Sequence, residues 1–302
     1  MRLSTQQFFS QNLDTVRNGN AELFKYQQQL ASGKKISQAS DDPLAATQIN
    51  KYEHVIARSE VFASNVDVAE RRLKLEESTL ALVSDSVLRI KDLAIQANNA
   101  TLNDTDREIV AEELRQILDQ LASAANTQDA QGEYLFSGFK GGAPAYALNA
   151  SDRYEYQGDH GQRFLDIGEN NTVASTDPGS AIFGDGTANI LNTVKDMIEL
   201  LDGTTPTTSF SDDISALQGE LDQFFEGVVT QRSKLGARLN VLEAQGEALA
   251  DIKLFTTNSL SVVQDTDYYE ATSKLMQQQT ALQAAYSSFG QIQQLSLFDY
   301  VG

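Results

Sequence analysis

The sequence predicts a mainly α-helical protein. Its long antiparallel helical bundle, or coiled-coil rod, is built from both chain ends, and a small β-rich domain is inserted in the middle. Three observations predict this fold. Apolar residues recur with a 3.5-residue period near both ends, as in helices that pack along one stripe. Residues 44–100 contain neither Pro nor Gly. The centre is rich in Gly, Asn and Asp, which indicates short strands and turns.

The composition restricts the possible functions. The 302 residues include 23 Lys or Arg and 42 Asp or Glu, a formal net charge of −19. Such a chain lacks the basic surface that nucleic-acid binding requires. Residues 131–230 hold four of the basic and sixteen of the acidic residues, so the centre should face solvent. There is no cysteine, which excludes disulfides and thiol catalysis. The sequence also contains no run of about 18 apolar residues, so it predicts no membrane-spanning segment.

The first predicted helix carries a narrow apolar stripe, in alternating steps of four and three residues. Its members are Phe9, Leu13, Val16, Leu23 and Leu30. The helix should end at Gly33, because glycine tolerates a positive φ at a helix C-terminus. The next helix should begin with Asp42 as its cap and Pro43 in its first position. We interpret Gly33, Asp42 and Pro43 as an inter-domain joint.

The second predicted helix, after Pro43, has the longest heptad pattern. Its stripe consists of Val66, Ala69, Leu73, Leu80, Val83, Val87, Ile90 and Ala94. Only Glu76 breaks this stripe. A return helix should follow a cap at Asn103 or Asp104. Its predicted apolar residues are Ile109, Leu114, Leu118 and Leu121.

The second half of the chain continues the pattern. The segments "RYEYQ" and "QRFLDIG" alternate as strands do, and "ILNTVKDMIELLDG" reads as a short helix. A long stripe follows at seven-residue spacing: Ile214, Leu221, Val228, Leu235, Leu242 and Leu249. Four glycines lie inside that run, and each costs a helix about 1 kcal/mol relative to Ala. The last helix carries Leu275, Leu282 and Phe289, with Ile292 beside them.

This order of elements predicts three domains. Residues 1–42 and 265–302 would form an inner coiled-coil domain of terminal helices. Residues 43–135 and 188–264 would form the long-helix rod. Residues 136–187 would form the small β-rich outer domain.

No catalytic, cofactor-binding or metal site is predicted, and we therefore expect a protein that is not an enzyme. The two histidines, His54 and His160, lie far apart, whereas metal sites need clustered ligands. Asp265 and Asp267 precede a helical run, where a helix cap explains them more simply than acid–base catalysis. The glycine-rich stretches "FSGFKGG" and "FGDGTAN" match neither a phosphate-binding loop nor a dinucleotide-binding motif.

The terminal helices are expected to be subunit interfaces. A helix pair with such narrow stripes buries too little apolar surface to be stable alone. Other subunits would then cover it and order it. The predicted interface residues are Phe9, Leu13, Val16, Leu23, Leu30, Leu275, Leu282, Phe289 and Ile292.

Several stretches resemble the flagellin superfamily. "LASGKKISQASDDPLAATQI" is similar to its N-terminal block, and "QRSKLGARLNVLEAQ" and "SVVQDTDYYEATSKLMQQQTALQAAYSSFGQIQQLSLFDYV" to its C-terminal blocks. The details "MRLSTQQFFS", "SDDP", "GEYLFSGFKG" and "LSLFDYV" resemble hook-associated proteins more than the filament protein. The resemblance covers about residues 1–140 and 225–302.

The resemblance implies a structural adaptor at the junction between the flagellar hook and filament. Such a protein forms a ring with copies of itself and contacts the other junction protein and the flagellin filament. It is extracellular and leaves the cell through the flagellar type III apparatus without a cleaved signal peptide. A cytoplasmic chaperone holds its C-terminal segment. Two alternatives remain open: a minor flagellin or filament subunit, and a secreted coiled-coil adhesin or needle-tip protein.

Overall fold

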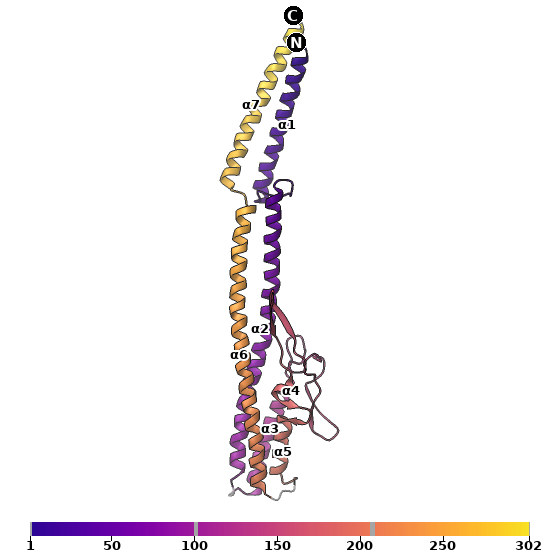
Figure 1. Cartoon of the computed structure of the whole chain (residues 1–302), viewed down its shortest axis with the longest axis vertical. Coiled ribbons are helices and arrows are strands. Elements are labelled where there is room, and N and C mark those ends of the chain that lie inside the picture. Colours follow the sequence, from indigo (N-terminus) through magenta and orange to yellow (C-terminus); the bar gives the residue numbers. More distant parts are fainter. Residues whose placement is uncertain (1, 100–101, 206–208, 302) are drawn as a thin grey trace. The chain divides into compact units, whose positions relative to one another are not determined.

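The fold consists mainly of long helices (Figure 1). The computed structural model describes residues 2–99, 102–205 and 209–301, except the side chains of 2–6, 8–9 and 292–301. The helices are α1 (Arg2–Ser32), α2 (Pro43–Ala97), α3 (Asp104–Ala125), α4 (Gly179–Ile182), α5 (Ile190–Leu201), α6 (Phe210–Gln264) and α7 (Tyr268–Val301). Within this description no helix is long and apolar enough to cross a membrane.

The chain divides into two compact units, here called the terminal unit and the central unit. The terminal unit comprises residues 1–58 and 251–302, and the central unit comprises residues 59–250. Helices α2 and α6 contribute to both units. The division into three domains stays a prediction from the sequence.

The central unit is organised around α2 and α6. Every residue of the predicted stripe in α2 from Val66 to Ala94 is at most 4% exposed, and so is every residue of the stripe in α6. Lys91 forms an ion pair with Asp222 at 2.5 Å, and Glu77 pairs with Arg232 at 2.7 Å. Because the residue numbers fall on one helix as they rise on the other, the two helices run antiparallel. Both heptad predictions are therefore confirmed for the central unit.

Helix α3 begins at the predicted cap, and one of its predicted apolar residues is exposed. The Asn103 side chain accepts a hydrogen bond from the Asp106 amide at 2.9 Å, and the Asp106 carboxylate accepts one from the Asn103 amide at 3.4 Å, which completes a capping box. Of the four apolar residues named for this helix, Leu114, Leu118 and Leu121 are buried, whereas Ile109 is 66% exposed. Val110 is buried instead, because it lies four residues before Leu114 and shares its helix face.

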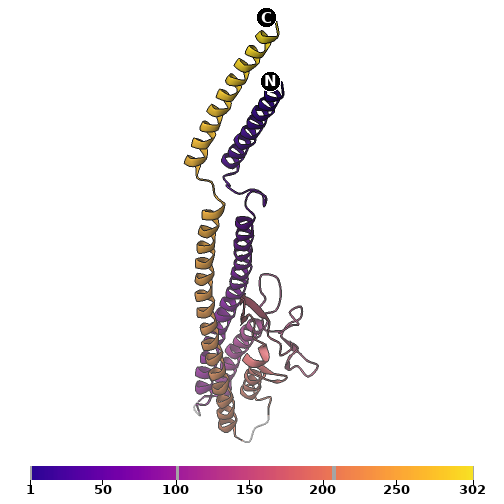
Figure 2. The same ribbon diagram turned by 45° about the horizontal axis from the view of Figure 1, so that its top comes forward.

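Short antiparallel strand pairs occupy the middle of the sequence, beside the helices of the central unit (Figure 2). They are β1 (Tyr146–Leu148) with β2 (Tyr154–Tyr156), β3 (Phe164–Gly168) with β4 (Asn171–Ala174), and β5 (Gly184–Asp185) with β6 (Ala188–Asn189). Buried aromatic residues of the strands and of the neighbouring loops pack together in this region. The ring centroids of Phe136 and Phe183 are 5.1 Å apart, and those of Tyr146 and Tyr156 are 5.2 Å apart. The predicted mainly α fold with a small central β region is confirmed.

An arginine of α2 holds the loop that precedes these strands. The Arg72 guanidinium lies 2.7 Å from both the Asp129 and the Glu133 carboxylates. Arg163 contacts the same Glu133 carboxylate at 2.6 Å. Hydrogen bonds from Arg72 and then Arg163 hold the pKa of Glu133 below its ordinary value.

Replacing the open glycines of α6 by alanine should stabilise the protein. The helix is continuous over 55 residues despite its glycines, and a Cβ atom at Gly219, Gly227 or Gly236 would meet nothing within 4 Å. Each Gly→Ala change should therefore raise the free energy of unfolding by up to about 1 kcal/mol. Thermal unfolding measures this, with Gly184→Ala as the opposite control. Gly184 has a φ of +101°, and its added Cβ would lie 2.4 Å from the Ala188 carbonyl oxygen.

Candidate assembly interface

Helices α1 and α7 lie side by side as an antiparallel pair (Figure 1). At the seam Leu282 is 7% exposed and packs against Gly19. A Cβ atom on Gly19 would lie 2.9 Å from the Leu282 Cδ2 atom, so this close approach depends on glycine. Two polar contacts flank it. The side-chain amide of Gln278 donates to the Gly19 backbone carbonyl at 3.2 Å, and the side-chain amide of Asn20 donates to the Tyr286 hydroxyl at 3.1 Å.

The predicted joint has the local geometry expected from its sequence. Gly33 has a φ of +70°, and its amide donates to the Gln29 carbonyl at 2.8 Å, which ends α1. The Asp42 carboxylate accepts hydrogen bonds from the Leu44 and Ala45 amides, both at 3.0 Å, and Pro43 is the first residue of α2. Gly33 is confirmed at the end of α1, and Asp42 and Pro43 are confirmed at the start of α2. Their role between domains stays a prediction.

The joint also pairs with the connection between α6 and α7. Lys34 and Asp265 form an isolated antiparallel bridge. The Lys35 amide donates to the Gln264 carbonyl at 2.7 Å, and the Thr266 amide donates to the Gly33 carbonyl at 2.9 Å. The connection between α1 and α2 and the connection between α6 and α7 are therefore hydrogen-bonded to each other. The sequence did not reveal this pairing, because the partners are more than 200 residues apart.

Replacing Gly33 by alanine should loosen the joint. A positive φ costs a non-glycine residue about 1–2 kcal/mol, and the new Cβ would lie 3.1 Å from the Tyr268 hydroxyl. We expect the Lys35 and Thr266 amides, which donate across the joint, to exchange with solvent about tenfold faster. Gly33→Asn is the control with the smaller expected effect, since asparagine tolerates this conformation better. Unchanged exchange in Gly33→Ala would contradict the strain argument.

The residues of the predicted stripes are incompletely covered within the chain. Leu282 is buried, and Leu13 is 42% exposed. Partly covered positions are Val16, Leu23, Leu30, Leu275 and Phe289. The side chains of Phe9 and Ile292 lie outside the described residues. Contact of these stripes with other subunits stays a prediction.

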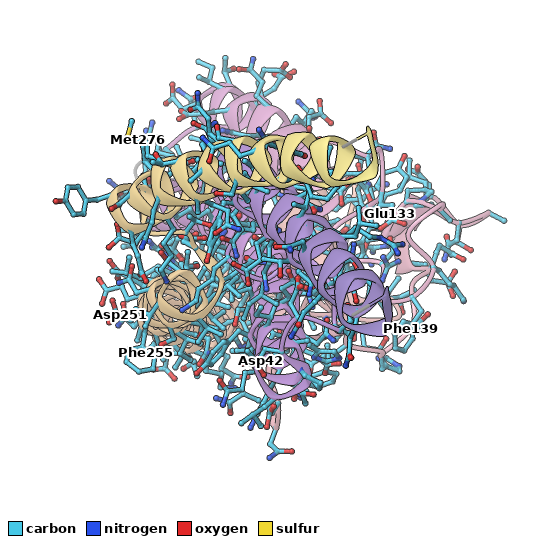
Figure 3. The ribbon with its side chains drawn as sticks, turned by 90° about the horizontal axis from the view of Figure 1, so that it is seen from above. Asp42, Glu133, Phe139, Asp251, Phe255 and Met276 are labelled. Atoms are coloured by element: carbon cyan, nitrogen blue, oxygen red, sulfur yellow. The ribbon has the colours of Figure 1, made fainter. Side chains whose placement is uncertain are left out.

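The terminal unit leaves many large apolar side chains exposed. Among its described residues, the buried apolar ones are Ala45, Ile49, Ala271 and Leu282. Large apolar side chains at seven-residue spacing are exposed at the end of α6, Phe255 (74%) and Val262 (85%), and at the start of α7, Tyr269 (88%) and Met276 (63%). We call these four residues the exposed row, and Figure 3 shows two of its members, Phe255 and Met276, pointing away from the ribbon. The sequence analysis missed this row and Gly19. A heptad count in every register would have found the row.

The structure places the residues that were weighed for catalysis or metal binding. Asp267 caps α7 by accepting hydrogen bonds from the Tyr269 and Glu270 amides, at 2.9 and 3.1 Å. His54 is exposed on α2, and His160 lies 2.8 Å from the Ser180 hydroxyl. Across the described ranges, no group of three His, Cys, Asp or Glu residues could hold a metal ion.

Comparison with known proteins agrees with this reading of the two chain ends. Residues 3–140 match the bacterial flagellin N-terminal helical region, and residues 219–301 match the C-terminal helical region. The chain is 32% identical to flagellar hook-associated protein 3 of Escherichia coli and 29% identical to that of Salmonella typhimurium. Each alignment covers 99% of both chains. A solved flagellar hook-associated protein from Vibrio parahaemolyticus superimposes with a TM-score of 0.69 at 26% identity. That match covers 74% of this chain and 99% of that one.

The paired terminal helices and the flagellin matches at both ends define a structural protein of the flagellin type, and its relatives are components of the flagellum, not enzymes. Within that class, the chain belongs to the flagellar hook-associated protein 3 family, also called FlgL. The resemblance noted from the sequence is confirmed.

Proposed function

We propose that the chain is an adaptor subunit of the hook–filament junction, where it assembles with copies of itself in a ring. Its relatives are flagellar hook-associated proteins, which supports a place between hook and filament components. The observation that carries the assembly role is the incomplete covering of the terminal unit. Its seam buries few apolar side chains, while the exposed row and Phe24, at 71% exposure, face outward.

Exposed apolar surface of this extent favours a protein partner. Monomeric proteins rarely leave large contiguous apolar patches uncovered, and a narrow helix pair gains most of its stability from further packing. Rings arise when one surface of a subunit binds a different surface of the next copy. The predicted stripes and the exposed row offer two such surfaces in the terminal unit.

The same surface would also need cover before assembly. We propose that a cytoplasmic chaperone binds the C-terminal segment, and that the chain leaves the cell through the flagellar type III apparatus to an extracellular position. Met276 and Tyr269, both exposed on α7, are the chaperone contacts we expect. The other junction protein and the flagellin filament are the expected neighbours in the assembled flagellum.

A deletion strain tests the junction role. Electron microscopy should find hooks without filaments, and flagellin should accumulate in the culture medium as unattached protein. Complementation with the wild-type gene is the control. The match of both chain ends to flagellin regions favours a minor filament subunit as second candidate, and deletion would then leave filaments attached. Attached filaments of normal length would reject the junction role.

A further inference from the structure

Glu76, the residue that breaks the stripe of α2, is an unpaired buried carboxyl. Its side chain is 0% exposed. Neither of its carboxyl oxygens accepts a hydrogen bond from any described group. Burying a charged carboxylate without donors is strongly unfavourable, so an ionised Glu76 does not fit this position.

The nearby cation is already engaged by another carboxylate. Arg238 of α6 donates to both oxygens of Asp177, at 2.7 and 3.0 Å. The Asp177 side chain is 1% exposed and also accepts a hydrogen bond from the Gln162 amide at 2.6 Å. The Asp177 carboxylate therefore has its donors and its counter-charge, and Arg238 has little left for Glu76.

The other charged groups around Glu76 are also paired. Glu77, the next residue on α2, contacts Arg232 of α6 at 2.7 Å. Asp177, Arg238 and Glu77 are the charged groups that act most strongly on Glu76, and each of them is paired with a group other than Glu76.

Two buried carboxyl groups thus lie near one guanidinium, which donates its hydrogen bonds to Asp177. Asp177 is the charged group that acts most strongly on Glu76, and two carboxyl groups can form a hydrogen bond only if one of them carries a proton. Burial, and then the Asp177 carboxylate, raise the pKa of Glu76 well above its ordinary value. The arrangement resembles other carboxyl pairs in which close like charges prevent both groups from ionising.

We propose that the central unit folds with a proton held between Glu76 and Asp177, and that this proton fastens the loop 175–178 to α2 and α6. The loop is fixed on both sides of Asp177. The Ser175 amide donates to the Arg163 carbonyl at 2.7 Å, and the Gly179 amide donates to the Phe136 carbonyl at 2.8 Å. The proton shared by Glu76 and Asp177 therefore joins the β region to the two longest helices. It does not rest on the proposed junction role.

The direction of the pH effect follows from the raised pKa. The folded state binds this proton more tightly than the unfolded chain, so the stabilisation is complete below the unfolded carboxyl pKa, about 4.3. It is lost as the pH rises through the folded pKa of Glu76. Ionised Glu76 then lies beside Asp177 without a donor, and the loop should loosen. Glu133 acts in the opposite direction, since its lowered pKa makes its contribution disappear at acid pH.

Glu76→Gln in the whole 302-residue chain tests the shared proton, because the glutamine side chain can donate a hydrogen bond to Asp177 at every pH. The melting temperature of the variant should equal that of the wild type near pH 4.5 and exceed it by about 3 °C or more at pH 8.5. Glu77→Gln is the matched control. It is the next residue on the same helix and loses a half-exposed ion pair, so no gain at high pH is expected. Equal pH profiles for wild type and Glu76→Gln would overturn the proposal.

Carbon-13 NMR of the glutamate carboxyl groups gives a readout that needs no stable variant. The Glu76 Cδ signal should titrate at a pH well above the pKa of a glutamate in an unfolded peptide, about 4.3. Glu76→Leu, which keeps a similar volume, assigns the signal if Glu76→Gln does not fold. A Glu76 signal that titrates at the unfolded-peptide value would overturn the proposal.

Discussion

Replacing Leu282 by aspartate is expected to leave cells with hooks but without attached filaments, while the central unit stays folded. Leu282 is the large side chain buried at the seam of α1 and α7, where it packs on Gly19. A carboxylate there would be desolvated without a partner, and the two helices should separate. Electron microscopy and swimming assays measure attachment. Thermal unfolding of the purified variant should retain the transition of the central unit.

Matched variants separate loss of the seam from general damage. Leu282→Met conserves volume and should keep motility. Leu23→Asp, in the facing stripe of α1, should reproduce the loss. Gly19→Ala should weaken the same seam, because its Cβ would lie 2.9 Å from Leu282, whereas Gly290→Ala meets nothing within 4 Å. Normal motility in both aspartate variants would exclude the terminal helix pair as an assembly surface.

Replacing Arg238 by alanine is expected to cause the largest loss of stability in the central unit. The change leaves the buried Asp177 carboxylate without its cation and beside Glu76. Removing one partner of a buried ion pair typically costs about 3–5 kcal/mol, which lowers the melting temperature by roughly 10 °C in a unit of this size.

Arg232→Ala is the matched control for this prediction. Arg232 lies on the same helix, and its ion pair with Glu77 is 34% exposed on both sides. Such a pair contributes about 1 kcal/mol or less. Equal destabilisation by Arg232→Ala and Arg238→Ala would show that the burial of Asp177 does not matter.

Local regularities were predictable from the sequence. The heptad stripes of α2 and α6 are buried as their spacing indicates, because a seven-residue repeat places its members on one face of a helix. The ends of α1 and α2 at Gly33, Asp42 and Pro43 follow from backbone preferences that act within a few residues. The resemblance to flagellins rests on the same segments. These properties depend on neighbours in the chain, so one sequence is enough to find them.

Other properties depend on contacts between distant segments, and only the tertiary structure decided them. Gly19 matters because Leu282 lies opposite it, and the joint is ordered because Lys34 pairs with Asp265. The sequence marked Glu76 only as a break in a stripe. Its importance comes from Asp177, which sits a hundred residues away in sequence and already holds the available arginine. Periodicity tells which face of a helix is buried, whereas the partner that arrives at that face is set by packing.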